Sequence, residues 1–340
     1  MSLPNLALPP LPTIRDLLRL YKLRAMRQLS QNFIMDERIT DKIVKAAGKI
    51  KGGHICEVGP GPGNITRSII KRSPNSLYLV EKDIRFSPFL EMLKDCAPCE
   101  INIINENVLS LNYQEFFPKN EAKGWSDETP NIHLIGNLPF NIATPLIIKW
   151  LKAISERSSA WAFGRVQMTL TFQKEVAERI VAPILSSQRC RLSLMAQNWC
   201  HVDHKFTIPG KAFVPKPKVD VGVVHFIPLK TPLVDEPFHF VENVCRSLFS
   251  FRQKYCCKSL GTLFHQSKRE KLTMELLERA SIPKETRAFQ ITHQELDRIC
   301  QAYKEMLLQD PSLETYNYRR NSISSMEIDE NKELDELVSY

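Results

Sequence analysis

A glycine-rich turn near residue 60 is the first feature of the sequence that can bind a ligand. Glu57-Val-Gly-Pro-Gly-Pro-Gly63 ends the short apolar run His54–Val58, and a helical pattern begins directly after it. Glycine has no Cβ, so the backbone of such a turn can approach a ligand closely. The glycines do not have the spacing of the dinucleotide-binding motif, which disfavours a nicotinamide cofactor. A turn that serves only for packing is the structural alternative.

An acidic residue follows the next apolar run, Ser76–Val80. Glu81 lies 22 residues after Gly59, and an acid at the end of a second strand can accept hydrogen bonds from both ribose hydroxyls of a bound nucleoside. Ligands of open α/β sheets bind at the carboxyl ends of the strands. We therefore expect Gly59, Gly61 and Glu81 to bind an adenosine-containing cofactor.

A polar turn, Asn137-Leu-Pro-Phe140, follows the apolar run Ile132–Ile135. The amino group of adenine is a weak nucleophile because its lone pair is delocalised into the ring. The side-chain oxygen of Asn137 and the backbone carbonyl of Leu138 can accept hydrogen bonds from both of its N–H groups and favour a reactive, pyramidal nitrogen. Pro139 restricts the turn, and Phe140 offers a stacking face for a base. The structural alternative is an Asn137 that bonds its own backbone.

Alternating strands and helices must position these residues. Apolar runs predict strands at residues 54–58, 76–80, 101–104, 132–135, 167–172 and 219–227, with helices after residue 64 and at 145–154 and 174–180. This alternation predicts an α/β fold whose parallel sheet is covered on both faces. After Pro228 the periodicity becomes helical throughout, at 238–251, 254–264, 269–280 and 294–308.

The chain is expected to divide into four segments, at residues 1–28, 29–229, 230–312 and 313–340. The first is basic and interleaved with leucine, with Asp16 its only acid, which is typical of a mitochondrial transit segment. A basic helix that packs on the domain or contacts RNA is the alternative. The last segment is polar and acidic, which predicts a disordered tail.

Charge and cysteine usage narrow the class of protein. The net charge is +8, but residues 327–336 carry −5, so the remainder carries +13, which suits a polyanionic partner. Nine scattered cysteines favour reduced thiols inside a cell. Neither Cys96 with Cys99 nor Cys200 with His201 and His204 has the spacing of a metal site, so no metal is expected. No apolar run approaches the roughly 20 residues that span a bilayer, and we expect a soluble protein without membrane contact.

Taken together, six segments resemble the ribosomal RNA adenine N6,N6-dimethyltransferases, in particular their mitochondrial branch. The resemblance covers roughly residues 11–318, and it is carried by Leu29-Ser-Gln-Asn-Phe33, Glu57 to Gly63, Glu81-Lys82, Asn137 to Phe140, Phe172-Gln-Lys-Glu175 and Pro209 to Val219. It implies a seven-stranded, Rossmann-like domain that uses S-adenosyl-L-methionine, followed by a small α-helical domain. It also implies a monomer in the mitochondrial matrix that acts on the assembling small ribosomal subunit. The implied substrate is two adjacent adenines in the hairpin loop near the 3′ end of small-subunit ribosomal RNA.

The resemblance also implies roles for individual residues. Gln31, Asn32, Ile34 and Gly59 would line the methionine end of the cofactor, Glu81 would hold the ribose, and Lys82, Asn107 and Val108 would lie at the adenine. Asn137 would face both cofactor and target, and Phe140 and Phe213 would stack on either side of the base. Without the resemblance, a rigid proline-rich loop that closes the edge of the core would be the favoured interpretation of Phe213.

Asn107 departs from the family pattern, which usually has Asp at this position. An asparagine can still accept a hydrogen bond through its side-chain oxygen, so altered rather than lost cofactor binding is expected. Lys216 and Lys218 are expected to contact RNA phosphates. Arg252 and Lys254 are equally consistent with RNA contact and with a solvated helix face.

Two other functions are open from the sequence. One is a nucleic-acid-binding factor for ribosome assembly or mitochondrial transcription that needs no methyl transfer, since the family that the chain resembles includes a relative recruited as a transcription factor. A DNA adenine methyltransferase would carry a closely related polar turn. The intact Asn137 turn and the glycine-rich turn favour catalysis over binding alone.

Overall fold

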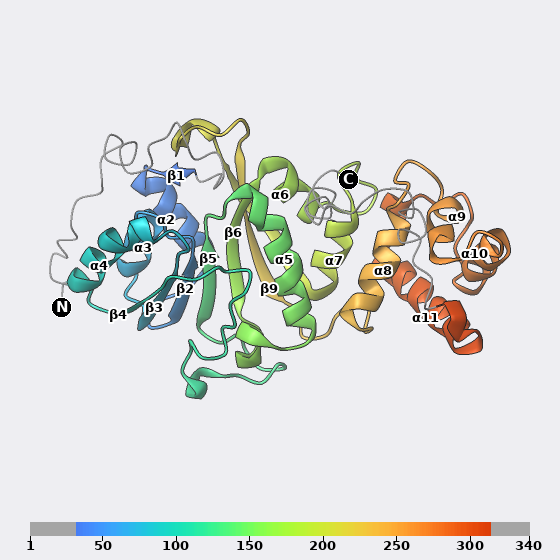
Figure 1. Cartoon of the computed structure of the whole chain (residues 1–340), viewed down its shortest axis with the longest axis horizontal. Helices are drawn as coiled ribbons and strands as arrows, with labels where there is room; N and C mark the ends of the chain where they lie inside the picture. Colours follow the sequence, from blue (N-terminus) through green and yellow to red (C-terminus); the bar gives the residue numbers. More distant parts are fainter. Residues whose placement is uncertain (1–31, 314–340) are drawn as a thin grey trace. The chain divides into compact units, whose positions relative to one another are not determined.

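The computed structural model describes residues 32–313, which form two compact units (Figure 1). Within the described range, the first unit comprises residues 32–177 and 202–230, and the second comprises 178–201 and 231–313. The predicted domains were 29–229 and 230–312, but residues 178–201 belong to the second unit. The reason is that α7 (Arg191–Trp199) packs against α8 (Phe238–Leu248). The expected transit segment at 1–28 and the expected tail beyond residue 313 lie outside the described residues.

The first unit is built on a sheet of seven strands, counted over the described residues, in the order β4-β3-β2-β5-β6-β9-β7. The strands are β2 (His54–Val58), β3 (Ser76–Val80), β4 (Glu100–Ile104), β5 (Ile132–Gly136), β6 (Gln167–Gln173), β7 (Cys200–Ile208) and β9 (Val221–Pro228). The five strands from β2 to β6 run parallel. The seven-stranded α/β architecture and all six predicted strands are therefore confirmed.

The expectation of a wholly parallel sheet was wrong, because β9 runs antiparallel to β6. Residues 209–220, which join β7 to β9, contain only a short 3₁₀ turn and the two-residue strand β8 (Phe213–Val214). β7 and β9 are neighbours in the sheet. A parallel pair of neighbours would need a crossover connection, usually a helix, which this segment does not contain. β8 instead pairs antiparallel with β1 (Phe33–Ile34), which brings residues 32–34 beside the loop.

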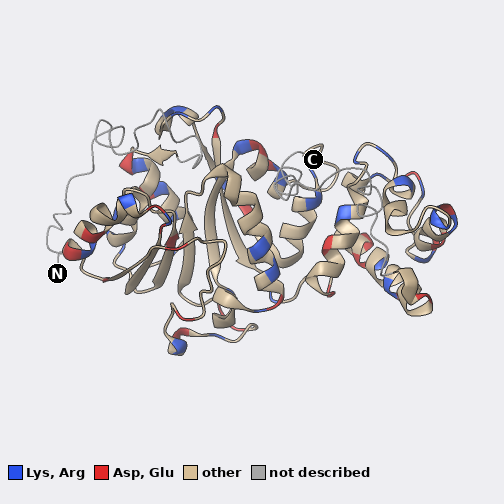
Figure 2. Cartoon of the chain, in the orientation of Figure 1, with Lys and Arg blue, Asp and Glu red and all other residues tan. Residues whose placement is uncertain are grey.

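Each face of the sheet is covered by helices. Ile55, Leu77 and Ile135 belong to a buried core formed with α2 (Glu37–Ala46), α3 (Asn64–Ile70) and α4 (Ser87–Cys96). Alternate residues point to the other face. There, aromatic rings connect the strands to α5 (Phe140–Ser155), with Tyr78 stacked on Phe116 and Tyr113 against Trp150. Figure 2 shows the Lys, Arg, Asp and Glu residues mostly on helices and loops, while the strands are drawn almost entirely in tan.

Several elements were absent from the sequence prediction. β7 is an edge strand whose residues are largely half-exposed, so it lacks the apolar run that marks a buried strand. The helix predicted to begin at Pro145 in fact begins at Phe140 and contains Pro145 inside it. Helices α2, α4 and α7 were not predicted either, because charged or polar residues interrupt their apolar residues.

The second unit is helical, as predicted. It contains the last three residues of α6 (Lys174–Ile180), together with α7, α8, α9 (Cys256–Ser259), α10 (Arg269–Arg279) and α11 (His293–Gln309). The predicted helix at 254–264 is instead the single turn α9 followed by a 3₁₀ turn, Leu260–Leu263. Helix α11 begins with a capping box, in which Thr292 and Glu295 exchange side-chain to backbone hydrogen bonds of 3.1 and 2.8 Å. Among the described helices, none is long and apolar enough to cross a membrane.

A buried histidine makes the stability of the first unit depend on pH. His133 on β5 is 3% exposed, and burial, with a smaller effect from His225, lowers its pKa to about 4. The unfolded chain, with a histidine pKa near 6.5, therefore binds more protons than the native state between about pH 6.5 and 4. The contribution of His133 to stability is constant above about pH 6.5 and is lost as the pH falls through this window.

We predict that the difference in unfolding free energy between the wild type and His133→Gln changes by about 3 kcal/mol between pH 7 and pH 4. The wild type should lose more stability than the variant, because only the wild type must protonate a buried imidazole. Urea unfolding at a series of pH values measures both curves. A difference in unfolding free energy that does not change with pH would contradict the lowered pKa of His133.

Candidate functional site

A cavity of about 250 Å³ lies where β2, β3, β4 and β5 end at the same edge of the sheet. The loops that follow these strands line it, together with residues 32–34. Nine of the ten residues predicted to bind a cofactor line this cavity: Asn32, Ile34, Gly59, Gly61, Glu81, Lys82, Asn107, Val108 and Asn137. The tenth, Gln31, lies outside the described residues. The cavity thus brings together residues that are up to 105 positions apart in the sequence.

The glycine-rich turn forms one wall of the cavity. Gly61 has a φ of 55°, a left-handed conformation that other residues rarely adopt. A Cβ built on Gly61 would lie 2.8 Å from the ring of Phe33, so only glycine fits between the turn and this ring. Glycine at residue 61 therefore lets the turn pack closely against Phe33. The turn also lines the cavity, where its backbone can approach a ligand, so the alternative of a turn that serves only for packing does not account for its position.

The carboxylate of Glu81 is fixed by two backbone donors. The N–H of Gly61 donates to Oε2 over 3.0 Å, and the N–H of Asp83 donates to Oε1 over 2.9 Å. Burial raises the pKa of this carboxyl, while the two backbone hydrogen bonds oppose that shift. Each oxygen keeps a further lone pair, so Glu81 can accept two more hydrogen bonds from the hydroxyls of a ligand.

A second buried carboxyl, Glu57, lies near the end of β2, just before the glycine-rich turn. Its side chain is 1% exposed, and the hydroxyl of Thr66 on α3 donates to Oε2 over 2.6 Å. Burial raises the pKa of Glu57 to about 8, so the group is mostly protonated near neutral pH. Glu57 does not line the cavity, and its bond to Thr66 links the end of β2 to the first turn of α3.

Asn137 lies beside the glycine-rich turn, with its side-chain amide held at both ends. Nδ2 donates to the backbone oxygen of Asn32 over 2.8 Å, and Oδ1 accepts from the hydroxyl of Thr171 over 2.9 Å. A Cβ built on Gly59 would lie 3.7 Å from the backbone oxygen of Asn137. The amide does not bond its own turn, as the structural alternative required. One lone pair of Oδ1 remains available as an acceptor.

Leu138 and Pro139 also line the cavity, whereas Phe140 and Phe213 do not. Phe140 is the first residue of α5 and is half-buried against the core. Phe213 is 2% exposed and belongs to that core, on β8 opposite Ile34. In this conformation Phe213 is part of the closed edge of the core, so the expected stacking of a base between the two rings remains a prediction.

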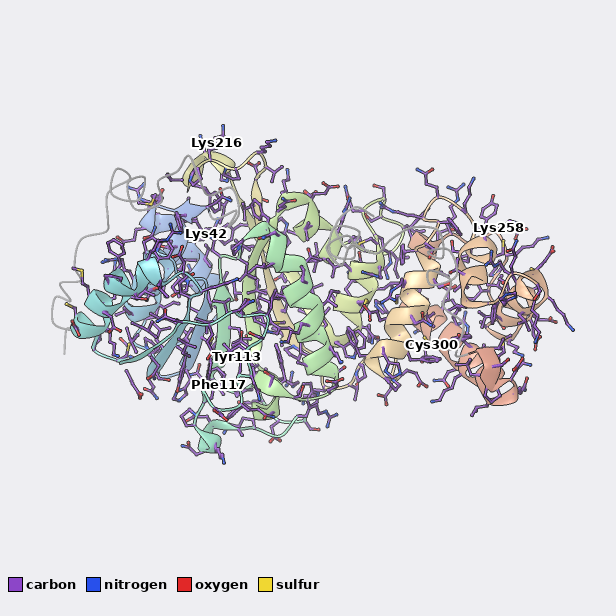
Figure 3. All side chains as sticks on the ribbon, in the orientation of Figure 1. Lys42, Tyr113, Phe117, Lys216, Lys258 and Cys300 are labelled. Atoms are coloured by element: carbon purple, nitrogen blue, oxygen red, sulfur yellow. The ribbon has the colours of Figure 1, made fainter. Side chains whose placement is uncertain are left out.

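The four basic residues predicted to contact RNA lie outside the cavity. Lys216 and Lys218 are exposed on the loop between β8 and β9, and Lys216 extends outward from that loop (Figure 3). Arg252 and Lys254 belong to the second unit, where Arg252 donates to the backbone oxygen of Ser187 and Lys254 is exposed. Their contacts with RNA remain predictions.

Sequence reasoning did not single out several residues of the site. The cavity is also lined by Phe33, Val58, Pro60, Pro62, Asn64, Ile65, Val80, Glu106, Leu109, Asn141 and Ile142. Most of these residues are adjacent in the sequence to a predicted site residue, so the predicted loops could have indicated them. Thr171 is different, because it is 34 residues from Asn137 and touches it only through the β5–β6 pairing. Its one signal was a hydroxyl within a buried apolar strand.

Comparisons with known proteins place the chain among rRNA-modifying enzymes. The model of the family "Ribosomal RNA adenine dimethylase" matches residues 22–299. The human protein "Dimethyladenosine transferase 1, mitochondrial" is 50% identical over 333 residues, covering 98% of this chain and 96% of the relative. The Xenopus tropicalis protein of the same name is 50% identical over 312 residues, covering 92% of this chain and 90% of the relative.

Two solved structures share the fold. A dimethyladenosine transferase from Plasmodium falciparum superposes with a TM-score of 0.63 at 22% identity, covering 80% of this chain and 98% of the other. The 23S rRNA methyltransferase ErmE gives a TM-score of 0.56 at 19% identity, covering 80% of this chain and 100% of the other. At these identities the likeness concerns the architecture of sheet and helices.

Asn107 generates a prediction for cofactor affinity. Its Oδ1 accepts a hydrogen bond from the N–H of Leu109 over 3.1 Å, and this donor fixes the orientation of the amide. Oδ1 keeps one lone pair, but the other end of the amide, Nδ2, can only donate, as does the exocyclic amino group of adenine. We predict that Asn107→Asp, which supplies a second acceptor oxygen, tightens binding of S-adenosylhomocysteine about tenfold, the effect of one net hydrogen bond.

Isothermal titration calorimetry measures this change. Asn105→Asp is a matched control, since it makes the same substitution at an exposed residue outside the cavity and should leave the affinity unchanged. Equal affinities for the wild type and Asn107→Asp would contradict the placement of the adenine at this residue.

Proposed function

The chain belongs to the ribosomal RNA adenine dimethylase family, and from that membership we propose that it dimethylates N6 of two adjacent adenines in the hairpin loop near the 3′ end of small-subunit ribosomal RNA. The observation that carries the proposal is the position of the Asn137 turn. Its side-chain amide lies on the cavity that holds the glycine-rich turn and Glu81. A methyl donor and an amino acceptor can therefore meet at the end of β5.

The residues of the cavity fit S-adenosylmethionine, the methyl donor of this family. Gly61 lines the cavity with no Cβ, Glu81 has two fixed oxygens with free lone pairs for ribose hydroxyls, and Asn107 and Val108 extend the site beyond β4. The order of these residues follows the order of the strands, from Asn137 after β5 to Asn107 after β4. When bound, the donor supplies an electrophilic methyl group on a positively charged sulfur.

The Asn137 turn would make the adenine amino group reactive. The remaining lone pair of Oδ1 and the backbone oxygen of Leu138 accept its two N–H groups, which draws the nitrogen lone pair out of conjugation with the ring. Pro139 has a φ of −56° and precedes the first residue of α5, so the helix anchors the turn in place. After accepting the methyl group, the nitrogen would release its proton to water.

The names of the relatives and the charge of the chain support a proposal for the compartment and the partners. The similar proteins carry "mitochondrial" in their names, and the basic, leucine-rich N-terminal sequence has the composition of a transit segment. We place the activity in the mitochondrial matrix, on the assembling small ribosomal subunit, with the protein acting as a monomer. The +13 charge of the chain outside residues 327–336 supports binding to the RNA backbone.

We predict that Asn137→Ala lowers the rate of N6 methylation about 100- to 1000-fold, the usual effect of losing one preorganised polar group in an active site. The assay is digestion of the rRNA hairpin after incubation with S-adenosylmethionine, followed by mass spectrometry of the adenosines. In cells that lack the protein, the variant should fail to restore dimethylation. Full rescue of ribosome assembly by Asn137→Ala would favour the alternative of a binding factor, and an unchanged rate of methylation would contradict the catalytic role of Asn137.

We also predict that Lys216→Ala and Lys218→Ala each weaken RNA binding without changing its sequence preference. Each variant should reduce the slope of log affinity against log salt concentration by about 0.7 to 1, since one phosphate contact is lost. Lys51→Ala is the control, because this exposed lysine precedes β2 and lies at the opposite edge of the sheet from the cavity. Unchanged slopes for both loop variants would exclude phosphate contacts there.

A further inference from the structure

A buried hydroxyl lies next to the Asn137 turn, outside the lining of the cavity. Thr171 on β6 is 0% exposed, and its hydroxyl donates to Oδ1 of Asn137 over 2.9 Å. The β5–β6 pairing ends with Gly136 opposite Leu170, so Asn137 and Thr171 are the next residues along the two strands. This register delivers the hydroxyl to the amide without any flexible segment between them.

The two hydrogen bonds of the amide together allow it one orientation. The backbone oxygen of Asn32 can only accept, so the end of the amide that faces it must be Nδ2. The hydroxyl of Thr171 then donates to the other end, Oδ1. A flipped amide would place its oxygen against the carbonyl oxygen of Asn32, which is repulsive. The terminal torsion of asparagine has a broad energy profile, so the neighbours set the orientation.

Orientation matters because the two ends of the amide have opposite hydrogen-bonding character. Oδ1 has two lone pairs, and Thr171 occupies one, which leaves one for an N–H group in the cavity. If the hydroxyl were absent, the bond to Asn32 alone would hold the amide, and Oδ1 would lose the contact that fixes its position. The acceptor needed for methyl transfer would then be less well placed toward the amino group of an adenine.

We propose that Thr171 is a positioning residue for methyl transfer, which fixes the side-chain oxygen of Asn137 toward the target amino group. The inference rests on the proposed function, since it assigns Thr171 a part in the reaction at the same site. It predicts that the rate of the chemical step depends on the Thr171 hydroxyl, while cofactor binding depends on it little, because Thr171 is outside the cavity lining.

Thr169 offers a matched control on the same strand and the same face of β6. It is 1% exposed, and its hydroxyl is hydrogen-bonded to Nδ1 of His225 over 2.9 Å. Replacing it by valine removes a buried hydroxyl and a hydrogen bond, as at Thr171, without touching Asn137. Any effect that merely reflects a lost buried hydroxyl should therefore occur in both variants.

The experiment compares Thr171→Val, Thr171→Ser and Thr169→Val with the wild type. Single-turnover rates of adenine N6 methylation on the rRNA hairpin, the affinity for S-adenosylhomocysteine and the thermal midpoint are measured for each protein. We expect Thr171→Val to lower the rate about tenfold, as for the loss of one net hydrogen bond, with cofactor affinity within about twofold. Thr171→Ser, which keeps the hydroxyl, should recover most of the rate, and Thr169→Val should have the wild-type rate.

Each outcome decides the proposal. A wild-type rate for Thr171→Val would overturn it, as would equal losses of rate in Thr171→Val and Thr169→Val. If Thr171→Val does not fold, Thr171→Ala tests the same loss of the hydroxyl in a smaller side chain. A wild-type protein that does not methylate adenine at all would instead contradict the proposed function, and this result is distinct from a failure of the Thr171 assignment alone.

Discussion

The site depends on how closely β2 and β5 approach each other where both strands end. Gly136 is the last residue of β5, and a Cβ at this position would lie 2.8 Å from the backbone oxygen of Val58. Because glycine permits this approach, the Asn137 turn lies beside the glycine-rich turn that follows β2. The amide of Asn137 then joins Asn32, before β1, to Thr171 on β6. One side chain thus connects three segments of the first unit at the mouth of the cavity.

Two buried carboxyls, Glu81 in the lining of the cavity and Glu57 outside it, have different roles. Glu57 and Glu81 both lie at the ends of neighbouring strands, and burial raises the pKa of each. Glu57, with a pKa of about 8, is mostly neutral near pH 7 and serves as a hydrogen-bonded link to Thr66. Glu81 instead accepts two backbone N–H groups, which favour its charged form. The two carboxyls therefore divide structural support and ligand binding between them.

Sequence reasoning located the parts of the site that follow buried strands. Glu81 and Asn137 come directly after apolar runs, and parallel strands carry their carboxyl ends to one edge of the sheet, so their convergence could be predicted. The orientation of the Asn137 amide could not, because it depends on Thr171, 34 positions away, and a hydroxyl within a buried apolar strand does not indicate its partner. The buried position of Phe213 agrees with the alternative of a proline-rich loop that closes the edge of the core, but the pairing that buries it, between β1 and β8, involves strands of only two residues each.

The fold shows the same division between local and non-local information. The apolar runs of β2 to β6 and the helical periodicity after residue 230 are local patterns, and both predicted the elements. The antiparallel direction of β9 and the half-exposed edge strand β7 depend on the connection between them rather than on their composition. The grouping of residues 178–201 with the helical unit depends on the packing of α7 on α8, which no pattern in α7 itself indicates.

A crystal structure of the full chain with S-adenosylhomocysteine and the rRNA hairpin would test the central claim most directly. The quantity to measure is the position of the target adenine N6 relative to the Asn137 turn. We expect N6 at about 3 Å from both Oδ1 of Asn137 and the backbone oxygen of Leu138, with the bond from Thr171 retained. A target nitrogen that faces Nδ2, or that contacts neither oxygen, would contradict the account.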